Sequence, residues 1–298
     1  MSMASKEDRG IGALYGLAVG DALGTTVEFS ARGTFAPVRD MIGGGPFRLR
    51  PGGWTDDTSM ALCLADTLIA GRGELDPALL LRLFVRWWRE GYASHTDDCF
   101  DIGTATRKAL LAFEATGSTT NNTDPAMQAN GSIMRLAPAV ICAPDREVAT
   151  KLSIAQGATT HAAEVPSDCC RELGGLLWDL IESGDRDLIG RHYSARSRAS
   201  VVSSGHAPAT LDAARWAVAT TKDFRSAVLK AVNLGGDADT VGAVAGQIAG
   251  ALYGISAIPP EWREKLAWSD WIEMRSRELW QIRLARIEGR RGGARIST

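Results

Sequence analysis

Glycine recurs at every fourth residue in two segments that lie far apart in the chain. The two series are Gly12, Gly16, Gly20 and Gly24, and Gly242, Gly246, Gly250 and Gly254. Residues four apart lie on one face of an α-helix, and a face without side chains lets a second helix approach closely. An interior glycine costs about 1 kcal/mol relative to alanine, so these series need a packing reason. They predict a tightly packed bundle of helices at the centre of the fold.

Helical periodicity also dominates outside the glycine series. Asp76 followed by Pro77 is typical of a helix N-terminus, and apolar side chains then recur at i, i+3 and i+4 through Trp88. Further helices are expected over residues 11–23, 57–70, 103–115, 147–158, 162–182, 207–220, 223–232 and 239–254. Because no run of alternating Val, Ile and Thr supports strands, the sequence predicts an all-α fold.

A last helix is expected to begin at Pro259 and Pro260. The residues expected on its single apolar stripe are Leu266, Trp271, Met274 and Trp280. No low-complexity linker divides the chain, so we predict one compact multi-helix domain over residues 6–288. The glycine- and arginine-rich residues 289–298 are expected to form a frayed basic tail.

The amino-acid composition limits the classes of molecule that this chain is expected to bind. The chain has 298 residues and a net charge of −2. Proteins that bind nucleic acids or anionic membranes usually carry a strong excess of basic residues. The most apolar stretch, residues 241–255, is shorter than the ~20 residues that a bilayer requires. The five cysteines show no CxxC spacing and are expected to be reduced. We therefore expect a cytoplasmic protein that binds neither nucleic acid nor membrane.

Two segments combine a glycine turn, two carboxylates and threonine hydroxyls immediately before an apolar helix. The first is residues 52–58 (GGWTDDT) and the second is residues 235–240 (GGDADT). Taken alone, either segment is explained by capping, because Asp and Thr are favoured at helix N-termini and acids complement the helix dipole. One capping acid suffices for a helix, however, and each segment supplies two.

If the two segments meet in space, their acids form a cluster that needs compensation. Two carboxylates ~4 Å apart repel by ~4 kcal/mol at an effective dielectric constant of 20. Carboxylates and hydroxyls are the ligands of hard divalent cations. Because no histidine lies beside either segment, Mg²⁺ or Mn²⁺ is favoured over zinc. A phosphatase or nuclease with clustered Asp and two metals also fits this pattern.

Four segments, in order, resemble motifs of the ADP-ribosylglycohydrolase family. They are residues 12–24 (GALYGLAVGDALG) with Glu28, 54–58 (WTDDT), 130–135 (NGSIMR) and 235–240 (GGDADT). The resemblance extends from about residue 9 to residue 260, and the best-known bacterial type of the family is the dinitrogenase-reductase-activating glycohydrolase. It implies an all-α fold with a binuclear Mg²⁺ or Mn²⁺ centre at the bottom of a cleft.

The resemblance also implies a set of metal ligands. They are Thr55, Asp56, Asp57 and Asp239 for one cation, and Asp237, Asp239 and Thr240 for the other, so that Asp239 bridges. Glu28 lies where the family places a metal-proximal or gating glutamate, although the residue type alone suggests a surface acid. Either Glu28 or a carboxylate of the Asp56–Asp57 pair would move protons, and the sequence does not separate acid from base.

The segment around Asn130 is expected to contact the substrate. A glycine turn at a helix start offers backbone N–H groups to an anion, although an ordinary N-cap explains Asn130 equally well. In the family this loop faces the diphosphate of ADP-ribose. The resemblance therefore implies substrate contacts from Asn130, Gly131, Ser132 and Met134.

Two further positions join the implied substrate site. His161 precedes a predicted helix and by itself suggests a structural histidine, but the family has a histidine that contacts ADP-ribose in this region. Asp101 and Gly103 precede another predicted helix, where the family lines the cleft near the scissile bond. A carboxylate pairs well with a guanidinium, so we take Asp101 as the candidate for recognising a modified arginine and as a catalytic residue.

The resemblance implies a metal-dependent hydrolase that removes ADP-ribose from protein side chains, with the N-glycosidic bond to arginine as the expected target. Alternative substrates in the same chemistry are serine-linked ADP-ribose, O-acetyl-ADP-ribose and poly-ADP-ribose. A non-catalytic role also stays open, because some family-like proteins are lens crystallins or bind and block a toxin. In that case the partner would be a cognate ADP-ribosyltransferase, which an immunity protein occludes or whose product it reverses.

Overall fold

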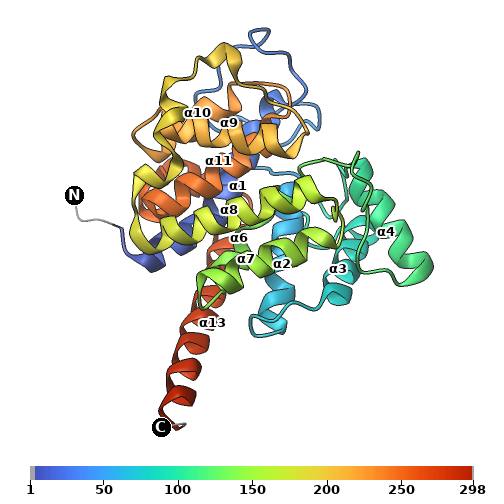
Figure 1. Ribbon diagram of the computed structural model, residues 1–298. Helices are drawn as coiled ribbons and strands as arrows, with labels where there is room; N and C mark the ends of the chain where they lie inside the picture. The colour runs from blue at the N-terminus through green and yellow to red at the C-terminus, as the bar shows by residue number, and fades with distance from the viewer. Residues whose placement is uncertain (1–3, 297–298) are drawn as a thin grey trace.

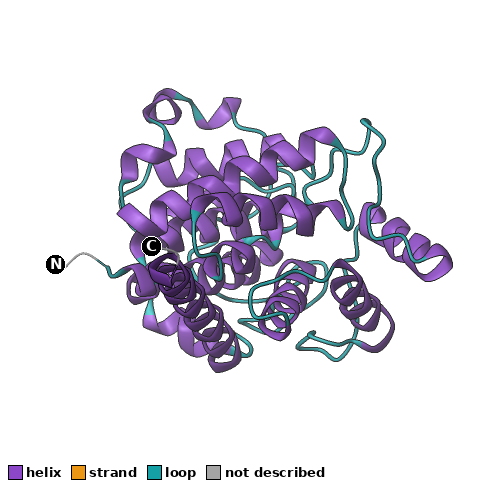
Figure 2. Ribbon diagram, turned by 60° about the horizontal axis from the view of Figure 1, so that its bottom comes forward, coloured by secondary structure: helices purple, strands orange, loops and turns teal. Residues whose placement is uncertain are grey.

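The computed structural model describes residues 4–296, and α-helices form most of it (Figure 1, Figure 2). The helices are α1 (Lys6–Gly24), α2 (Asp56–Ala70), α3 (Pro77–Glu90), α4 (Thr104–Thr116), α5 (Gly131–Met134), α6 (Ala137–Ile141), α7 (Arg146–Ala158), α8 (Glu164–Ser183), α9 (Ala207–Ala219), α10 (Phe224–Val232), α11 (Ala238–Tyr253), α12 (Pro260–Lys265) and α13 (Ser269–Ile296). Short 3₁₀ turns cover Thr25–Val27, Arg186–Ile189, Arg191–Ala195, Arg198–Ser200 and Ile255–Ala257. No strand forms between residues 4 and 296, which confirms the all-α prediction.

Helices α1 and α11 cross at the centre of the molecule with their glycine faces in contact (Figure 1). A Cβ atom on Gly16 would lie 2.3 Å from the carbonyl oxygen of Gly246, and one on Gly20 would lie 2.0 Å from that of Gly242. Lower-numbered positions of α1 meet higher-numbered positions of α11, so the two helices run antiparallel. The contact between backbones confirms the tight central packing that the glycine series predicts.

The remaining helices surround this pair. Helices α8, α9 and α10 pack against α11 on one side, whereas α2 lies on the other side, with α3 and α4 beyond it (Figure 1). Large aromatic side chains such as Trp54, Trp87 and Trp262 are fully buried between these layers. The long helix α13 packs against α1 and α2 and then extends away from the body (Figure 1). None of the described helices is both long and apolar enough to cross a membrane.

Most helices begin and end within a few residues of the predicted bounds. The helix expected over 162–182 begins at Glu164, so His161 lies in the turn before it and not in its first turn. Capping explains several starts: the Asp76 side chain, for example, accepts hydrogen bonds from the N–H groups of Ala78 and Leu79.

The single C-terminal helix expected from Pro260 is wrong. Helix α12 ends at Lys265, Trp268 adopts the left-handed conformation with φ of 57°, and α13 begins at Ser269. This break resets the helical register, so the expected residues do not share one buried stripe. Leu266 and Trp280 are buried, whereas the exposed fractions of Trp271 and Met274 are 42% and 39%. The backbone of α13 is helical through Ile296, residues 297–298 lie outside the described chain, and the frayed tail at 289–298 stays a prediction.

Candidate active site

Asp21 connects the end of α1 to the start of α2. Its fully buried carboxylate accepts hydrogen bonds from the backbone N–H and hydroxyl of Thr55, both at 2.9 Å, and from the Thr58 hydroxyl at 2.6 Å. An acid from another helix therefore stabilises the N-terminus of α2, where Asp56 and Asp57 are the first two residues. Because Asp21 supplies this capping interaction, the carboxylates of Asp56 and Asp57 are not needed to cap α2 and are available to bind a ligand.

A second set of hydrogen bonds places Glu28 beside the start of α11. The N–H of Phe29 donates to the carbonyl of Gly236 at 2.8 Å, and the N–H of Gly236 donates to the carbonyl of Ser30 at 2.8 Å. Gly235 and Gly236 have φ of 69° and 65°, a left-handed conformation that glycine adopts without strain. This turn aligns the segment after α1 with the first residues of α11, so Glu28 lies near Asp239.

The two acidic helix starts meet, and Asp239 belongs to two groups of carboxylates. In one group, ligand atoms of Asp56, Asp57 and Asp239 lie within 4.8 Å of one another. In the other, ligand atoms of Glu28, Asp101 and Asp239 satisfy the same limit. Asp239 is therefore the carboxylate that the two groups share. The second group contains Glu28 and Asp101, neither of which the implied ligand set included.

The carboxylates in these groups are held close together, and none of them forms a salt bridge with a basic side chain of the described residues. Burial raises the pKa of Glu28 to about 11, and repulsion from Asp239 and then Asp101 adds to the increase. Burial also raises the pKa of Asp101 to about 7, and the pKa values of Asp56, Asp57 and Asp239 lie well above the ordinary value for the same first reason. Ionised carboxylates in this arrangement need protons or cations, because like charges at this distance repel strongly.

Several oxygen atoms of the cluster have no hydrogen-bond partner. Glu28 Oε2, Asp57 Oδ1 and Asp239 Oδ1 are buried and unpartnered among the described residues. Leaving a buried acceptor unpaired costs about 1–3 kcal/mol, so these oxygens are suited to a ligand that the protein itself does not supply. An all-oxygen donor set of carboxylates and hydroxyls fits a hard divalent cation. The acidic groups of this chain can therefore hold a metal ion.

Most of the predicted site residues line one cavity of about 370 Å³. They are Glu28, Asp56, Asp101, Gly103, Asn130, Gly131, Met134, His161, Asp237, Asp239 and Thr240. Thr55 and Asp57 lie fully buried beneath this surface, where the Thr55 hydroxyl is 3.4 Å from Asp239 Oδ2 and the Thr240 hydroxyl is 3.4 Å from Asp57 Oδ2. Segments from six parts of the sequence thus form one acidic pocket.

The Asn130 loop lines the same cavity as the acidic groups. Asn130 Nδ2 donates to Asp237 Oδ2 at 2.5 Å, which ties the loop to the residue before α11. A Cβ atom on Gly131 would lie 2.7 Å from Cε1 of His161, so only glycine allows the loop to contact this ring. Ser132 does not line the cavity. Its side chain is fully buried near Gly157 on α7.

Sequence reasoning missed several residues that shape the site. Asp21 fixes the α2 start, and its signal was an acid inside the otherwise small and apolar end of α1. Phe29 lines the cavity with 67% of its surface exposed, and Lys108 is the basic side chain among the described lining residues. No pattern in the sequence distinguished Phe29 or Lys108 from ordinary surface residues.

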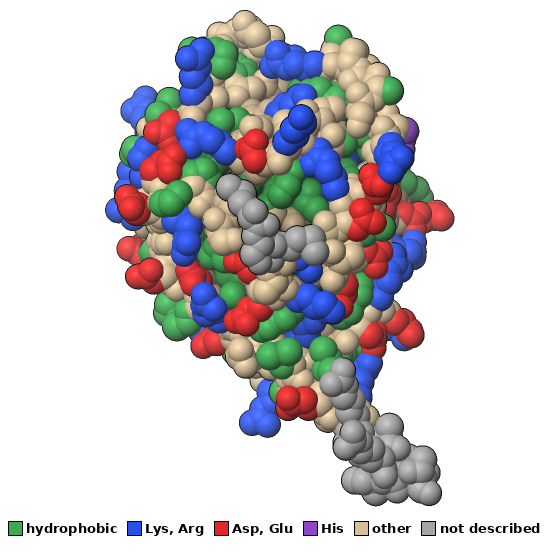
Figure 3. All heavy atoms as spheres, turned by 90° about the vertical axis from the view of Figure 1, so that its left-hand side faces the viewer, with side chains coloured by type: hydrophobic (Ala, Val, Ile, Leu, Met, Phe, Trp, Pro, Cys, Tyr) green, Lys and Arg blue, Asp and Glu red, His purple; other side chains and the backbone are tan. Residues whose placement is uncertain are grey.

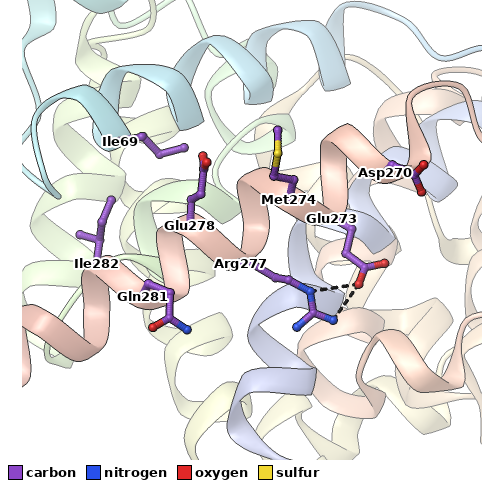
Figure 4. A pocket seen from close by; sticks show the side chains of 8 residues that line it. All are labelled: Ile69, Asp270, Glu273, Met274, Arg277, Glu278, Gln281 and Ile282. Atoms are coloured by element: carbon purple, nitrogen blue, oxygen red, sulfur yellow. Dashed lines mark hydrogen bonds and ion pairs between the residues drawn. The ribbon is translucent and has the colours of Figure 1, made fainter.

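A larger hollow lies along α13 and is chemically different (Figure 4). Its volume is about 730 Å³, and α13 supplies most of its lining, with Ile69 of α2 opposite. Arg277 donates to Glu273 at 2.7 Å, so this hollow contains an ion pair between two of its lining residues. The face in Figure 3 likewise mixes basic and acidic side chains. The concentration of acids at the α2 and α11 starts therefore marks the 370 Å³ cavity as the candidate active site.

Comparisons with known proteins identify the family and the fold. The family model described as ADP-ribosylglycohydrolase matches residues 2–288. A protein of Pseudomonas putida (strain GB-1), named ADP-ribosylarginine hydrolase Tri1, is 45% identical over 91% of this chain and 78% of its own length. A Rhodospirillum rubrum protein, named ADP-ribosyl-[dinitrogen reductase] glycohydrolase, is 35% identical over 89% of this chain and 92% of its own. A solved structure described as an ADP-ribosylglycohydrolase-related protein complex superposes with a TM-score of 0.83 at 40% identity, covering 94% of this chain and 99% of that one.

Proposed function

The chain belongs to the ADP-ribosylglycohydrolase family, and from this premise we propose that it hydrolyses the N-glycosidic bond between ADP-ribose and an arginine side chain of a protein. The chain is a hydrolase, as the family model and the relatives named as hydrolases together indicate. The arginine linkage is supported by two relatives named ADP-ribosylarginine hydrolase, which are 45% and 43% identical to it over 91% and 92% of its length. The observation that carries the proposal is the convergence of two acidic helix starts on one cavity, with Asp239 in both carboxylate groups.

The donor set supports two divalent cations, Mg²⁺ or Mn²⁺. Asp56, Asp57 and Asp239, with the Thr55 hydroxyl, would hold one of them. The other would be held by Asp239 together with Glu28 and Asp101, and Asp237 and Thr240 lie on the same cavity wall. When bound, such cations orient hydroxyl groups and lower the pKa of a water molecule.

The protein's own residues would bind and polarise the modified arginine. Departure of the leaving group builds positive charge on the ribose, and the carboxylates around Asp239 are placed to stabilise that charge. Asp101 lines the cavity and offers a carboxylate to the guanidinium. Glu28 and Asp56 also line the cavity, so each is placed to hold or move the proton exchanged between water and the leaving nitrogen.

The Asn130 loop and its neighbours would bind the ADP part of the substrate. Gly131 and the ring of His161 lie side by side in the cavity lining, which also contains Met134 and Gly103. Lys108 adds a positive charge to this lining, which suits a diphosphate. The cavity therefore offers both carboxylates for the arginine and ribose and a cation for the diphosphate of ADP-ribosyl-arginine.

The test is release of free ADP-ribose from arginine-modified protein with Mg²⁺ or Mn²⁺ present. We expect turnover with either cation and loss of turnover in excess chelator. Serine-modified peptide and O-acetyl-ADP-ribose, assayed in parallel, should react more slowly. Full-rate hydrolysis by the chelated protein, or a preference for the serine linkage, would contradict the proposal.

A partner is part of the proposal as well. We propose that the modified target is produced by an ADP-ribosyltransferase whose effect this chain reverses. The complete acidic set favours reversal by hydrolysis over occlusion of the transferase. Cells challenged with a transferase should lose protection when Asp239 is replaced by alanine. Protection that survives this change would instead support occlusion.

A further inference from the structure

Arg135 lies directly beneath the Asn130 loop and is fully buried. Its guanidinium donates to the Gln156 side chain at 2.9 Å, the Gly131 carbonyl at 2.8 Å and the Thr160 hydroxyl at 2.7 Å. Each of these acceptors is neutral. Burial of a charge without an ionic partner is costly, so the position of this arginine requires an explanation beyond packing.

The direction of the hydrogen bonds follows from what each group is able to donate. An arginine guanidinium carries N–H donors and no acceptor, so the Thr160 oxygen accepts from Arg135. The same oxygen lies 2.7 Å from Nδ1 of His161. If Nδ1 carried a proton, the buried Thr160 hydroxyl would have no acceptor for its own hydrogen among the described residues. The hydroxyl hydrogen therefore points to Nδ1, and Nδ1 accepts.

The other ring nitrogen of His161 carries the proton as a consequence. Burial lowers the pKa of His161 to about 3, with the charge of Arg135 contributing, so the ring is neutral at physiological pH. A neutral imidazole with an accepting Nδ1 is the Nε2–H tautomer. No described residue accepts from Nε2. The ring lines the cavity, and Nε2 would lie 3.0 Å from a Cβ atom on Gly131, so this N–H is available beside the Asn130 loop.

We propose that Thr160, oriented by Arg135, is a positioning residue that fixes His161 as an Nε2–H donor to an oxygen of the bound substrate. The proposal rests on the function proposed above, in which that oxygen belongs to the phosphate or ribose of ADP-ribose. Arg135 also holds the carbonyl of Gly131, so one guanidinium sets both the loop and the ring that face the ligand. The other neutral tautomer, Nδ1–H, would place a lone pair of Nε2, and not a proton, toward an electron-rich oxygen.

The first experiment measures the tautomer directly in the unmodified protein. The chain has four histidines, so the ¹⁵N resonances of uniformly ¹⁵N-labelled His161 can be assigned by comparison with a His161→Gln variant. We expect Nε2 protonated and Nδ1 unprotonated at neutral pH. A protonated Nδ1 in the wild type would overturn the proposal, whatever the outcome for activity.

The second experiment removes the relay and restores it. Thr160→Val deletes the hydroxyl at similar volume, and Thr160→Ser keeps it. Loss of a hydrogen bond to a charged oxygen corresponds to roughly 10-fold or more in binding, so Thr160→Val should raise KM for ADP-ribosyl-arginine about 10-fold and mix the two tautomers. Thr160→Ser should return both readouts close to wild type.

Thr159 provides a matched control. It is also fully buried, and its hydroxyl donates to the carbonyl of Gln156 at 2.7 Å without contacting His161. Thr159→Val should lower stability without changing the tautomer or KM. Equal effects of the two valine variants, or no change of tautomer in Thr160→Val, would overturn the proposal. If the wild type releases no ADP-ribose, the proposed function is refuted. The tautomer measurement does not depend on activity and would still test the role of Thr160.

Discussion

The carboxylate of Asp21 accepts hydrogen bonds from both the backbone N–H and the hydroxyl of Thr55, each at 2.9 Å. Asp21 is on α1 and Thr55 precedes α2, so this interaction joins two helices that are distant in sequence at the edge of the acidic cluster. The interaction fixes the start of α2, where Asp56 and Asp57 are the first two residues. Asp21 itself does not line the cavity. Asp21 thus acts on the site by positioning the proposed ligands.

Replacing Asp21 with alanine should therefore weaken metal binding as well as stability. The change leaves the buried donors of Thr55 and Thr58 unpaired, and each such loss costs about 1–3 kcal/mol. We expect at least roughly 3 kcal/mol lower stability in urea and weaker Mn²⁺ binding by calorimetry. Asp76→Ala, which removes an exposed capping acid from α3, should cost about 1 kcal/mol and leave Mn²⁺ binding intact. Equal Mn²⁺ affinities of the two variants would contradict this role of Asp21.

Asp239→Asn should abolish turnover and lower the number of bound cations. Its carboxylate belongs to both acidic groups, so the amide removes a charged ligand from each of them. We expect a drop of at least ~100-fold in ADP-ribose release and loss of tight Mn²⁺ binding. Asp187→Asn, at an exposed ion pair with Arg191, serves as the control and should behave as wild type. Retention of two tight sites in Asp239→Asn would show that the bridging position is assigned wrongly.

Gly246→Ala should be strongly destabilising, although alanine is the better helix former. A Cβ atom there would lie 1.9 Å from the carbonyl oxygen of Gly16, so the two central helices would have to separate. Overpacking of this kind costs about 1–3 kcal/mol or more, which exceeds the ~1 kcal/mol gained in helix propensity. Gly289→Ala, in α13, meets nothing within 4 Å and should instead stabilise by roughly 0.5–1 kcal/mol. Urea unfolding of both variants provides the measurement.

His161 should make the protein less stable in mild acid. Its pKa is about 3 in the folded protein, whereas in the unfolded chain it is about 6.5. Between these values the unfolded state binds more protons, so the stabilising contribution is complete above the unfolded pKa and declines as pH falls. Between about pH 7 and about pH 5, the free energy of unfolding of the chelator-treated wild type should fall by roughly 1–2 kcal/mol more than that of His161→Gln. The buried carboxylates, whose raised pKa values act in the opposite direction, are common to both proteins and cancel. Identical slopes would contradict the neutral, buried state of His161.

Much of the fold follows from the sequence because its helices carry local signals. The helix expected over 239–254 is observed at Ala238–Tyr253, since a glycine turn and an acid mark its start. The division of the last helix into α12 and α13 was not predicted, because the left-handed Trp268 between them has no local signature. The residue pattern alone did not predict that Glu28 lies beside Asp239, although the resemblance implied a metal-proximal glutamate there. This proximity depends on hydrogen bonds between Phe29, Ser30 and Gly236, which are distant in sequence.

The glycine contact between α1 and α11 has a consequence for motion and for evolution. With main chain against main chain, neither helix is able to slide past the other, because every step would drive one carbonyl into the next. Asp21 on α1 and Asp239 on α11 are therefore held in fixed relative positions, whichever ligand binds. Only the surrounding loops can move to widen the pocket for a larger substrate. Differences in substrate preference between related chains are therefore expected to arise in these loops.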